Sequence, residues 1–181
     1  AAQFIVDSVL AHPSEITLAP VGPLTNIALA VRLEPRIVSL VKEVVIMGGA
    51  ATVPGNASPV AEANIHNDPL AAAIVFSAGW PLTMVGLDVT MKTIMTKEYL
   101  ADLSRTGNKA TELIRRIAPF YQAFFDKTYG MGGSIHTHDP SAIACLIDRG
   151  LFRVERMPVF VETEGHCAGY TVPDRRRQWG D

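Results

Sequence analysis

Hydrophobic positions follow a helical spacing over residues 1–11 and then switch to short buried runs. The helical spacing predicts a helix that ends before Pro13, because proline cannot continue the backbone hydrogen-bonding pattern. Residues 15–19 predict a short strand, residues 23–34 a second helix, and residues 38–41 a further helical turn. The buried face of the first helix is predicted to contain Phe4, Ile5, Val9 and Leu10.

The middle of the chain alternates buried strands with helices. The run KEVVIMGG, residues 42–49, is rich in β-branched residues and ends in a glycine pair, which is typical of a strand buried on both faces. Residues 50–67 predict a long loop, and loops of this length inside a compact domain are often functional. Asp68 followed by Pro69 predicts an N-capped helix, and residues 81–90 predict the next strand.

The second half of the chain continues the same alternation, with predicted helices at residues 97–105, 108–128 and 140–147 and predicted strands near residues 151–162 and 168–172. Alternating strands and helices predict an α/β fold with a parallel, doubly wound sheet, formed as a single domain over residues 1–181. Ligands bind such sheets beyond the carboxyl ends of the strands. We therefore expect the loops after Ala19, Met47 and Gly86 to meet the segment before Pro140.

Composition and charge exclude several classes of partner. The chain has 181 residues, of which 48% are hydrophobic and 19% are charged, which is enough to form a globular core. Its formal net charge is -2, and it has no long Lys/Arg-rich block, so neither nucleic acid nor an anionic membrane is expected as a partner.

The sequence shows no recognisable targeting signal and no disulfide pattern, so a cytoplasmic protein is expected. No apolar run reaches the length of a membrane-spanning helix, and the first residues do not resemble a signal peptide. Cys145 and Cys167 have no CxxC spacing, so neither a disulfide framework nor a zinc site is predicted. Because the chain opens in helical rhythm without a methionine, we expect a longer polypeptide to precede residue 1.

The first cluster of reactive side chains lies in the loop over residues 50–67, which contains Asn56, Glu62, Asn64, His66 and Asn67. A carboxylate with several carboxamides can hold a sugar or polyol through directional hydrogen bonds, without a formal charge on the ligand. The same side chains could instead satisfy the backbone of the loop. Both interpretations stand at this point.

A second cluster is the sequence IHTHDP, residues 135–140. Asp139 is a natural N-cap for a helix that begins at Pro140, but its carboxylate is also a suitable ligand for a hard cation such as Ca²⁺. His138 is the histidine best placed to act as an acid or hydrogen-bond donor near neutral pH. The turn LAPVGPLTN, residues 18–26, offers carbonyl oxygens to a cation or is an ordinary strand-to-helix junction. The glycine pairs form neither GxGxxG nor a Walker loop, which argues against a Rossmann-type oxidoreductase.

Five stretches, taken in order, resemble the inosine-uridine preferring nucleoside hydrolase family: LAPVGPLTNIALAVRLEPRI, KEVVIMGGA, GNASPVAEANIHNDPLAA, TMVGLDVT and HTHDP. The resemblance spans nearly the whole chain. It implies a Rossmann-like open α/β fold with a mostly parallel sheet flanked by helices. It also implies a calcium-dependent N-ribohydrolase that cleaves nucleosides to ribose and free base and forms a homodimer or homotetramer.

The resemblance assigns roles residue by residue. Calcium is expected to bind the backbone carbonyl of Val21 and the carboxylate of Asp139. His138 is the expected catalytic residue, which assists departure of the base. The residues expected to contact substrate are Met47, Asn56, Glu62, Asn64, His138 and Asp139. Further candidates for contacts to the base are Asp126, Tyr129 and His136, although Tyr129 could equally be a packing residue.

Two departures from the family pattern change the expectation. The family's aspartate cluster, of the form D-T-D-P-G-x-D-D, supplies the remaining calcium carboxylates and the general base, and no such string occurs in this sequence. We therefore expect a central and C-terminal fragment of a nucleoside hydrolase, inactive or impaired alone. The alternative is a non-catalytic ligand-binding or interaction module derived from that fold. Ala63 also stands where some relatives have an aromatic residue, which puts stacking against a purine at that position in doubt.

Overall fold

The computed structural model describes residues 1–176, and the last five residues of the predicted domain, 177–181, lie outside the described residues. The chain divides into two compact units. Among the described residues, the first unit comprises residues 1–89 and 139–176, and the second comprises residues 90–138. The single domain over the whole chain stays a prediction.

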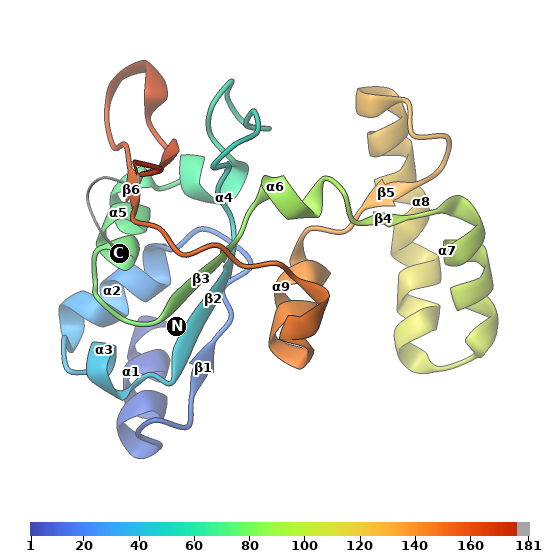
Figure 1. The fold of residues 1–181 in the computed structure, drawn as a ribbon. Helices are drawn as coiled ribbons and strands as arrows, with labels where there is room; N and C mark the ends of the chain where they lie inside the picture. Colours follow the sequence, from blue (N-terminus) through green and yellow to red (C-terminus); the bar gives the residue numbers. More distant parts are fainter. Residues whose placement is uncertain (177–181) are drawn as a thin grey trace. The chain divides into compact units, whose positions relative to one another are not determined.

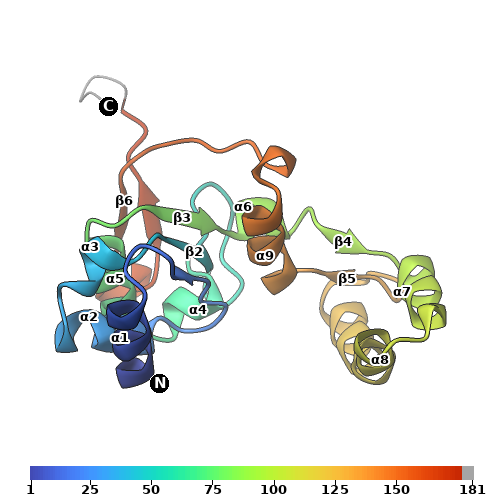
Figure 2. The ribbon, with the colours of Figure 1, turned by 90° about the horizontal axis from the view of Figure 1, so that it is seen from below.

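The first unit contains a three-stranded parallel sheet in the order β1-β2-β3, formed by β1 (Thr17–Leu18), β2 (Glu43–Met47) and β3 (Leu82–Val85). One face is covered by α1 (Ala2–Ala11), α2 (Thr25–Leu33), α3 (Ile37–Leu40) and α5 (Pro69–Phe76). The other face is covered by α9 (Asp139–Ile147) (Figures 1 and 2). Helices on both faces of a parallel sheet confirm the predicted α/β fold. An antiparallel pair, β6 (Val159–Val161) and β7 (Thr171–Pro173), lies beside α5.

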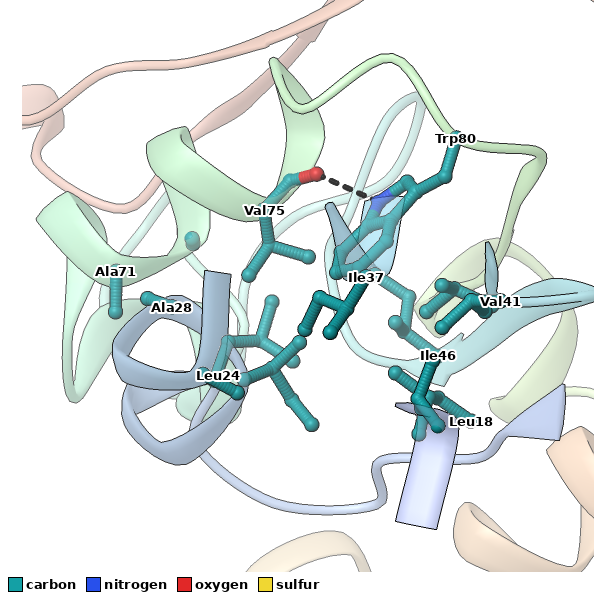
Figure 3. Close-up of a cluster of buried hydrophobic side chains, with 14 of the residues drawn as sticks. Leu18, Leu24, Ala28, Ile37, Val41, Ile46, Ala71, Val75 and Trp80 are labelled. Atoms are coloured by element: carbon teal, nitrogen blue, oxygen red, sulfur yellow. Dashed lines mark hydrogen bonds between the residues drawn. The ribbon is translucent and has the colours of Figure 1, made fainter. Parts of the chain in front are cut away.

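The core of the first unit is aliphatic and lies between the sheet and the four helices on its first face (Figure 3). Ile37, Val44 and Ile46 have no exposed surface. Full burial of such a side chain stabilises a fold by about 1.5–3 kcal/mol. Trp80 closes the core, and its indole Nε1–H donates a hydrogen bond of 2.9 Å to the carbonyl of Val75.

The second unit is small and contains mostly helix. It begins at Thr90, the last residue of α6 (Leu87–Thr90), and its two-stranded antiparallel sheet pairs β4 (Ile94–Met95) with β5 (Ile135–His136). The helical part comprises α7 (Lys97–Leu103), a 3₁₀ turn (Ser104–Thr106) and α8 (Lys109–Tyr129). None of the helices within residues 1–176 combines the length and apolar character that a bilayer span requires.

The helix α8 begins and ends where its sequence contains capping residues. Asn108 accepts a hydrogen bond of 2.9 Å from the backbone N–H of Thr111, and the Thr111 hydroxyl accepts one from the Asn108 N–H, which forms a capping box. The helix ends at Gly130, which adopts a left-handed conformation with φ of 66°. The predicted helix over residues 108–128 is therefore confirmed.

Three predictions about the first unit are wrong in detail. Phe4 is 74% exposed, and the buried residues of α1 are Val6 and Val9, because the neighbouring helices α2 and α3 decide which face of α1 is covered. The helix α2 begins at Thr25 rather than near Pro23. Residues 50–67 are not one continuous loop, because Glu62 caps a short helix, α4 (Ala63–His66).

Other segments differ from the predictions in class or in length. Residues 87–90, predicted as the end of a strand, form the helix α6. The strand predicted near residues 151–162 is confined to Val159–Val161, after a 3₁₀ turn over Arg149–Leu151. No pattern in the sequence predicts β4 or β5, because strands of two residues are too short to show alternation.

Candidate functional site

Glu62 is the central polar residue of the first unit, and it is only 2% exposed. Its Oε2 accepts hydrogen bonds from three backbone N–H groups, those of Gly49 and Asn64 at 3.0 Å and that of Ile65 at 3.4 Å. Its Oε1 takes part in no hydrogen bond between described residues. Glu62 therefore satisfies local backbone with one oxygen and retains a second oxygen for a ligand.

Gly49 lets the backbone turn toward Glu62 directly after β2. Its φ of 90° is in the left-handed region, which glycine adopts without strain. A Cβ atom at this position would also approach the sulfur of Met84 at 2.5 Å. The second glycine of the MGG run is therefore required by the geometry that brings the Gly49 N–H to the carboxylate of Glu62.

Burial of the carboxyl group raises the pKa of Glu62 above its ordinary value. The hydrogen bonds from Asn64, Gly49 and Ile65 oppose this effect because they stabilise the carboxylate, and the nearby negative charge of Asp139 adds to the rise. An acidic group with a raised pKa, held by backbone donors and close to a second carboxylate, is typical of ligand-binding or catalytic sites.

Asn64 lies beside Glu62 and contacts Met47 at the end of β2. Its Nδ2 donates hydrogen bonds to the Met47 carbonyl at 3.1 Å and to the Met47 sulfur at 3.3 Å. Met47 is 3% exposed. The structure therefore brings together three predicted substrate-binding residues, Met47, Glu62 and Asn64, at the carboxyl end of a central strand.

Asn56 is exposed, and its Oδ1 accepts a hydrogen bond of 2.9 Å from the backbone N–H of Ala63. The loop that carries Asn56 is held at its start by Asp88, which the sequence analysis did not single out. Asp88 accepts hydrogen bonds from the backbone N–H of Ala51 at 2.9 Å, the backbone N–H of Thr52 at 2.8 Å and the Thr52 hydroxyl. Burial alone would raise the pKa of Asp88, but these hydrogen bonds outweigh it and lower that pKa.

Val21 and Asp139 line one open pocket of about 540 Å³. The remaining lining residues are apolar: Ala19, Pro140, Ile143, Ala144 and Ile147. Val21 is 39% exposed and follows Pro20, whose carbonyl accepts a hydrogen bond of 3.0 Å from the Met47 N–H. The two residues predicted to bind calcium therefore face the same hollow in the first unit.

Asp139 is the first residue of α9, whereas the sequence predicted a helix that begins at Pro140 with Asp139 as its N-cap. That prediction is wrong by one residue, because the backbone of Asp139 is already helical. Asp139 is an exposed residue, yet the chain around it removes enough water to raise the pKa of its carboxyl. When burial raises the pKa of a carboxyl group, a nearby cation would stabilise its charged form.

His138 belongs to the second unit, where its ring is partly buried. Its Nδ1 lies 2.8 Å from the hydroxyl of Thr90, and the ring centroid lies 6.3 Å from that of Phe125 and 6.0 Å from that of His136. Burial lowers the pKa of His138, and the neighbouring His136 lowers it further. No local pattern in the sequence indicates a role for Thr90, which is 48 positions from His138 along the chain.

The other candidates for base contacts lie in the same unit. Asp126 holds the glycine-rich loop, because its Oδ1 accepts a hydrogen bond of 2.7 Å from the Gly133 N–H. Tyr129 stacks on Phe125 at a centroid distance of 5.7 Å, which agrees with its alternative role as a packing residue. His136 is 8% exposed, and its Nδ1 is buried without a hydrogen-bond partner among the described residues. Burial also lowers the pKa of His136.

The sequence of the chain is similar to those of known nucleoside hydrolases. The chain is 47% identical over 178 residues to the inosine-uridine preferring nucleoside hydrolase of Leishmania major, covering 97% of this chain and 56% of the relative. It is 42% identical over 175 residues to a pyrimidine-specific ribonucleoside hydrolase of Escherichia coli, covering 96% of this chain and 55% of the relative. The chain thus spans about half the length of these curated relatives.

Solved structures agree with these sequence matches. A plant nucleoside hydrolase superposes with a TM-score of 0.95 at 34% identity, covering 99% of this chain and 57% of the plant chain. A purine-preferring ribonucleoside hydrolase from Gardnerella vaginalis superposes with a TM-score of 0.91 at 37% identity, covering 98% and 56% of the two chains. The model of the family described as inosine-uridine preferring nucleoside hydrolase matches residues 1–181. With its fold and its full-length match to that model, the chain belongs to the inosine-uridine preferring nucleoside hydrolase family.

Proposed function

We propose that the protein hydrolyses the N-glycosidic bond of purine and pyrimidine ribonucleosides, releasing ribose and the free base. The observation that carries this proposal is the cluster at the end of β2, where Glu62 and Asn64 present hydrogen-bonding groups beside buried Met47. Such a set of oxygens and amides suits the hydroxyl groups of ribose. The names of the relatives, which describe nucleoside hydrolases, support the same reaction.

The reaction needs a water molecule at C1′ of ribose, stabilisation of the positive charge that develops on the sugar, and a proton for the departing base. Water adds its hydroxyl to C1′ of ribose as the bond to the base breaks, and the remaining proton ends on the base nitrogen. The sugar becomes positively charged in the transition state, so carboxylates near it are stabilising. Glu62 and Asn64 would orient the ribose hydroxyls, and this orientation speeds the reaction if the contacts tighten in the transition state. His138 would donate a hydrogen bond to the departing base.

Calcium is proposed as the cofactor, and the donor chemistry of this chain fits it in part. Ca²⁺ binds carboxylate and carbonyl oxygens, and Asp139 and Val21, which both line one pocket, contain such groups. Roughly six to eight oxygens are needed, however, and no group of three or more His, Cys, Asp or Glu side chains suited to a metal occurs within residues 1–176. The chemistry that bound calcium supplies is orientation of the ribose diol and of a water molecule, and a lower pKa of that water.

The remaining assignments are also proposals. The substrate is a small nucleoside, and the protein acts as a homodimer or homotetramer in the cytoplasm. The contributions of Asn56 to ribose binding and of His138 to departure of the base belong to the same proposal. No observation on the described residues favours the alternative of a non-catalytic module.

Base release from inosine and uridine tests the proposal. The assay uses the longest natural polypeptide that includes residues 1–181, with Ca²⁺ present. We expect hypoxanthine and uracil to be released, and Asp139→Asn to lower kcat/KM by about 100-fold or more. The matched control is Asp102→Asn, because Asp102 is an exposed residue that pairs with Arg105 and should not affect the reaction. No release of base from either nucleoside, or equal activity of wild type and Asp139→Asn, would overturn the proposal.

A further inference from the structure

Thr90 and His138 form a hydrogen bond that the proposed reaction does not explain by itself. Thr90 is the last residue of α6 and has no exposed surface. Its Oγ1 lies 2.8 Å from Nδ1 of His138, although the two residues are 48 positions apart in the sequence. A buried polar pair of this kind constrains both members, because breaking it would leave a buried hydroxyl without a partner.

The direction of this hydrogen bond follows from the donors available. A threonine hydroxyl carries one hydrogen, and a buried donor without an acceptor costs about 1–3 kcal/mol. Within residues 1–176, the hydrogen bond found for the Thr90 hydroxyl is the one with His138. The hydroxyl therefore donates to Nδ1. A neutral imidazole that accepts at Nδ1 carries its proton on Nε2.

The aromatic rings around His138 hold its imidazole in one orientation. Phe125 packs against the His138 ring at an interplanar angle of 31°, and the His136 ring lies at 42°. The Thr90 hydroxyl contacts one edge of the ring and Phe125 packs against one face. The Nε2–H lies on the opposite edge and therefore points away from Thr90.

We propose that Thr90 is a positioning residue that holds His138 as the Nε2–H tautomer and thereby aims a hydrogen-bond donor at the departing base. The part of this inference that concerns the base rests on the proposed function. The part that concerns the tautomer depends only on Thr90 and His138. Thr90 itself touches no reacting atom and acts through His138 alone.

Nitrogen-15 NMR of the histidine rings tests the tautomer without any assay of activity. In wild type we expect Nδ1 of His138 to resonate as an unprotonated nitrogen and Nε2 as a protonated one, with the signals assigned by their loss in His138→Gln. Thr90→Val keeps the shape of the side chain but removes the hydroxyl, so it should give a mixture of the two tautomers. Thr90→Ser should retain the wild-type pattern, as should the control Thr106→Val at an exposed position.

Kinetics then test the consequence for the reaction in the longest natural polypeptide that includes residues 1–181. We expect Thr90→Val to lower kcat by about 10- to 100-fold with little change in KM, and Thr90→Ser to restore most of the loss. A proton on Nδ1 in wild type overturns the inference even if Thr90→Val does not fold. An unchanged tautomer in folded Thr90→Val also overturns it. If the predicted tautomers are found but no base is released, the positioning by Thr90 stands and the proposed function fails.

Discussion

Residues 1–89 and 139–176 are organised around a parallel sheet, whereas residues 90–138 are organised around one aromatic side chain. In the first unit the aliphatic core extends from the strands into four helices, and many of its members have no exposed surface. In the second unit Phe125 is 3% exposed and contacts five rings: Tyr121, Phe124, Tyr129, His136 and His138. Several large apolar residues of α8 remain exposed: Leu113, Ile117, Phe120, Tyr121 and Phe124.

This difference separates two kinds of site residue. Glu62 and Asn64 are attached to the end of a buried strand, so the groups proposed to hold ribose belong to a rigid framework. The position of the His138 ring depends on a small aromatic core whose central residue is Phe125. Regions with few buried contacts open at lower free energy than the core of a domain. The proposed donor to the base should therefore be more mobile than the proposed ribose-binding groups.

The largest expected effect is a cavity in the core of the first unit. Ile46→Ala removes a fully buried side chain from β2 and should lower the free energy of unfolding by about 2–5 kcal/mol. Denaturation in urea measures this change. Ile117→Ala, at a position that is 56% exposed in the second unit, is the matched control and should change stability by less than about 0.5 kcal/mol. Similar losses of unfolding free energy in both variants would contradict the expectation that the buried position in the first unit contributes more to stability than the exposed position in the second.

The next effect should be confined to the second unit. Phe125→Ala removes the central ring of the aromatic cluster and should lower the free energy of local opening by about 3 kcal/mol. Hydrogen exchange of the amides in α8 and β5 measures this opening. Phe124→Ala, at a position that is 52% exposed, should have little effect. Equal acceleration of exchange in β2 would contradict the independence of the two cores.

Acid should destabilise the second unit. Burial lowers the pKa of His136 below its ordinary value of 6.5, so the opened state binds more protons than the native state between the lowered pKa and 6.5. The stability of the second unit should therefore fall as the pH drops through that window. His136→Phe keeps a ring against Phe125 and Tyr129 and should reduce the dependence on pH, with the remainder due to His138. Hydrogen exchange at several pH values is the measurement, and an unchanged pH dependence in His136→Phe would exclude His136 as its source.

The smallest expected effect has the opposite sign and concerns the first unit. Burial raises the pKa of Glu62 above 4.5, so the native state binds more protons than the unfolded state in the window above 4.5. Stability should therefore fall as the pH rises through this window. Glu62→Gln keeps an oxygen for the backbone N–H groups and should raise Tm by about 2 °C at pH 8, with a smaller gain at pH 4. Calorimetry measures Tm, with the exposed Glu155→Gln as the control, and a lower Tm in Glu62→Gln at pH 8 would contradict this sign.

Sequence predicted the features that depend on neighbouring residues. The strand β2 was predicted from its β-branched run, and α5 was predicted from Asp68 and Pro69, because strand propensity and N-capping are local signals. The Asp68 side chain accepts a hydrogen bond of 3.0 Å from the Ala71 N–H, as an N-cap should. The grouping of Glu62 with Asn64 was also predictable, because the two residues are two positions apart.

Features that depend on distant residues were not predictable from a single sequence. The contact between Thr90 and His138 and the anchoring of Thr52 by Asp88 join residues 48 and 36 positions apart. The buried face of α1 is set by the elements that pack on it, so the helical spacing alone chose Phe4 wrongly. The positions of Asn56 and His138 relative to a bound ribose likewise stay predictions, because no local pattern fixes them.

We propose that Asp139 and the Val21 carbonyl share one calcium ion next to the proposed ribose-binding residues. Calorimetric titration with Ca²⁺ tests it in the longest natural polypeptide that includes residues 1–181. We expect Asp139→Asn to weaken calcium binding by about 100-fold and Asp102→Asn to match wild type. Equal calcium affinity in wild type and Asp139→Asn would contradict it.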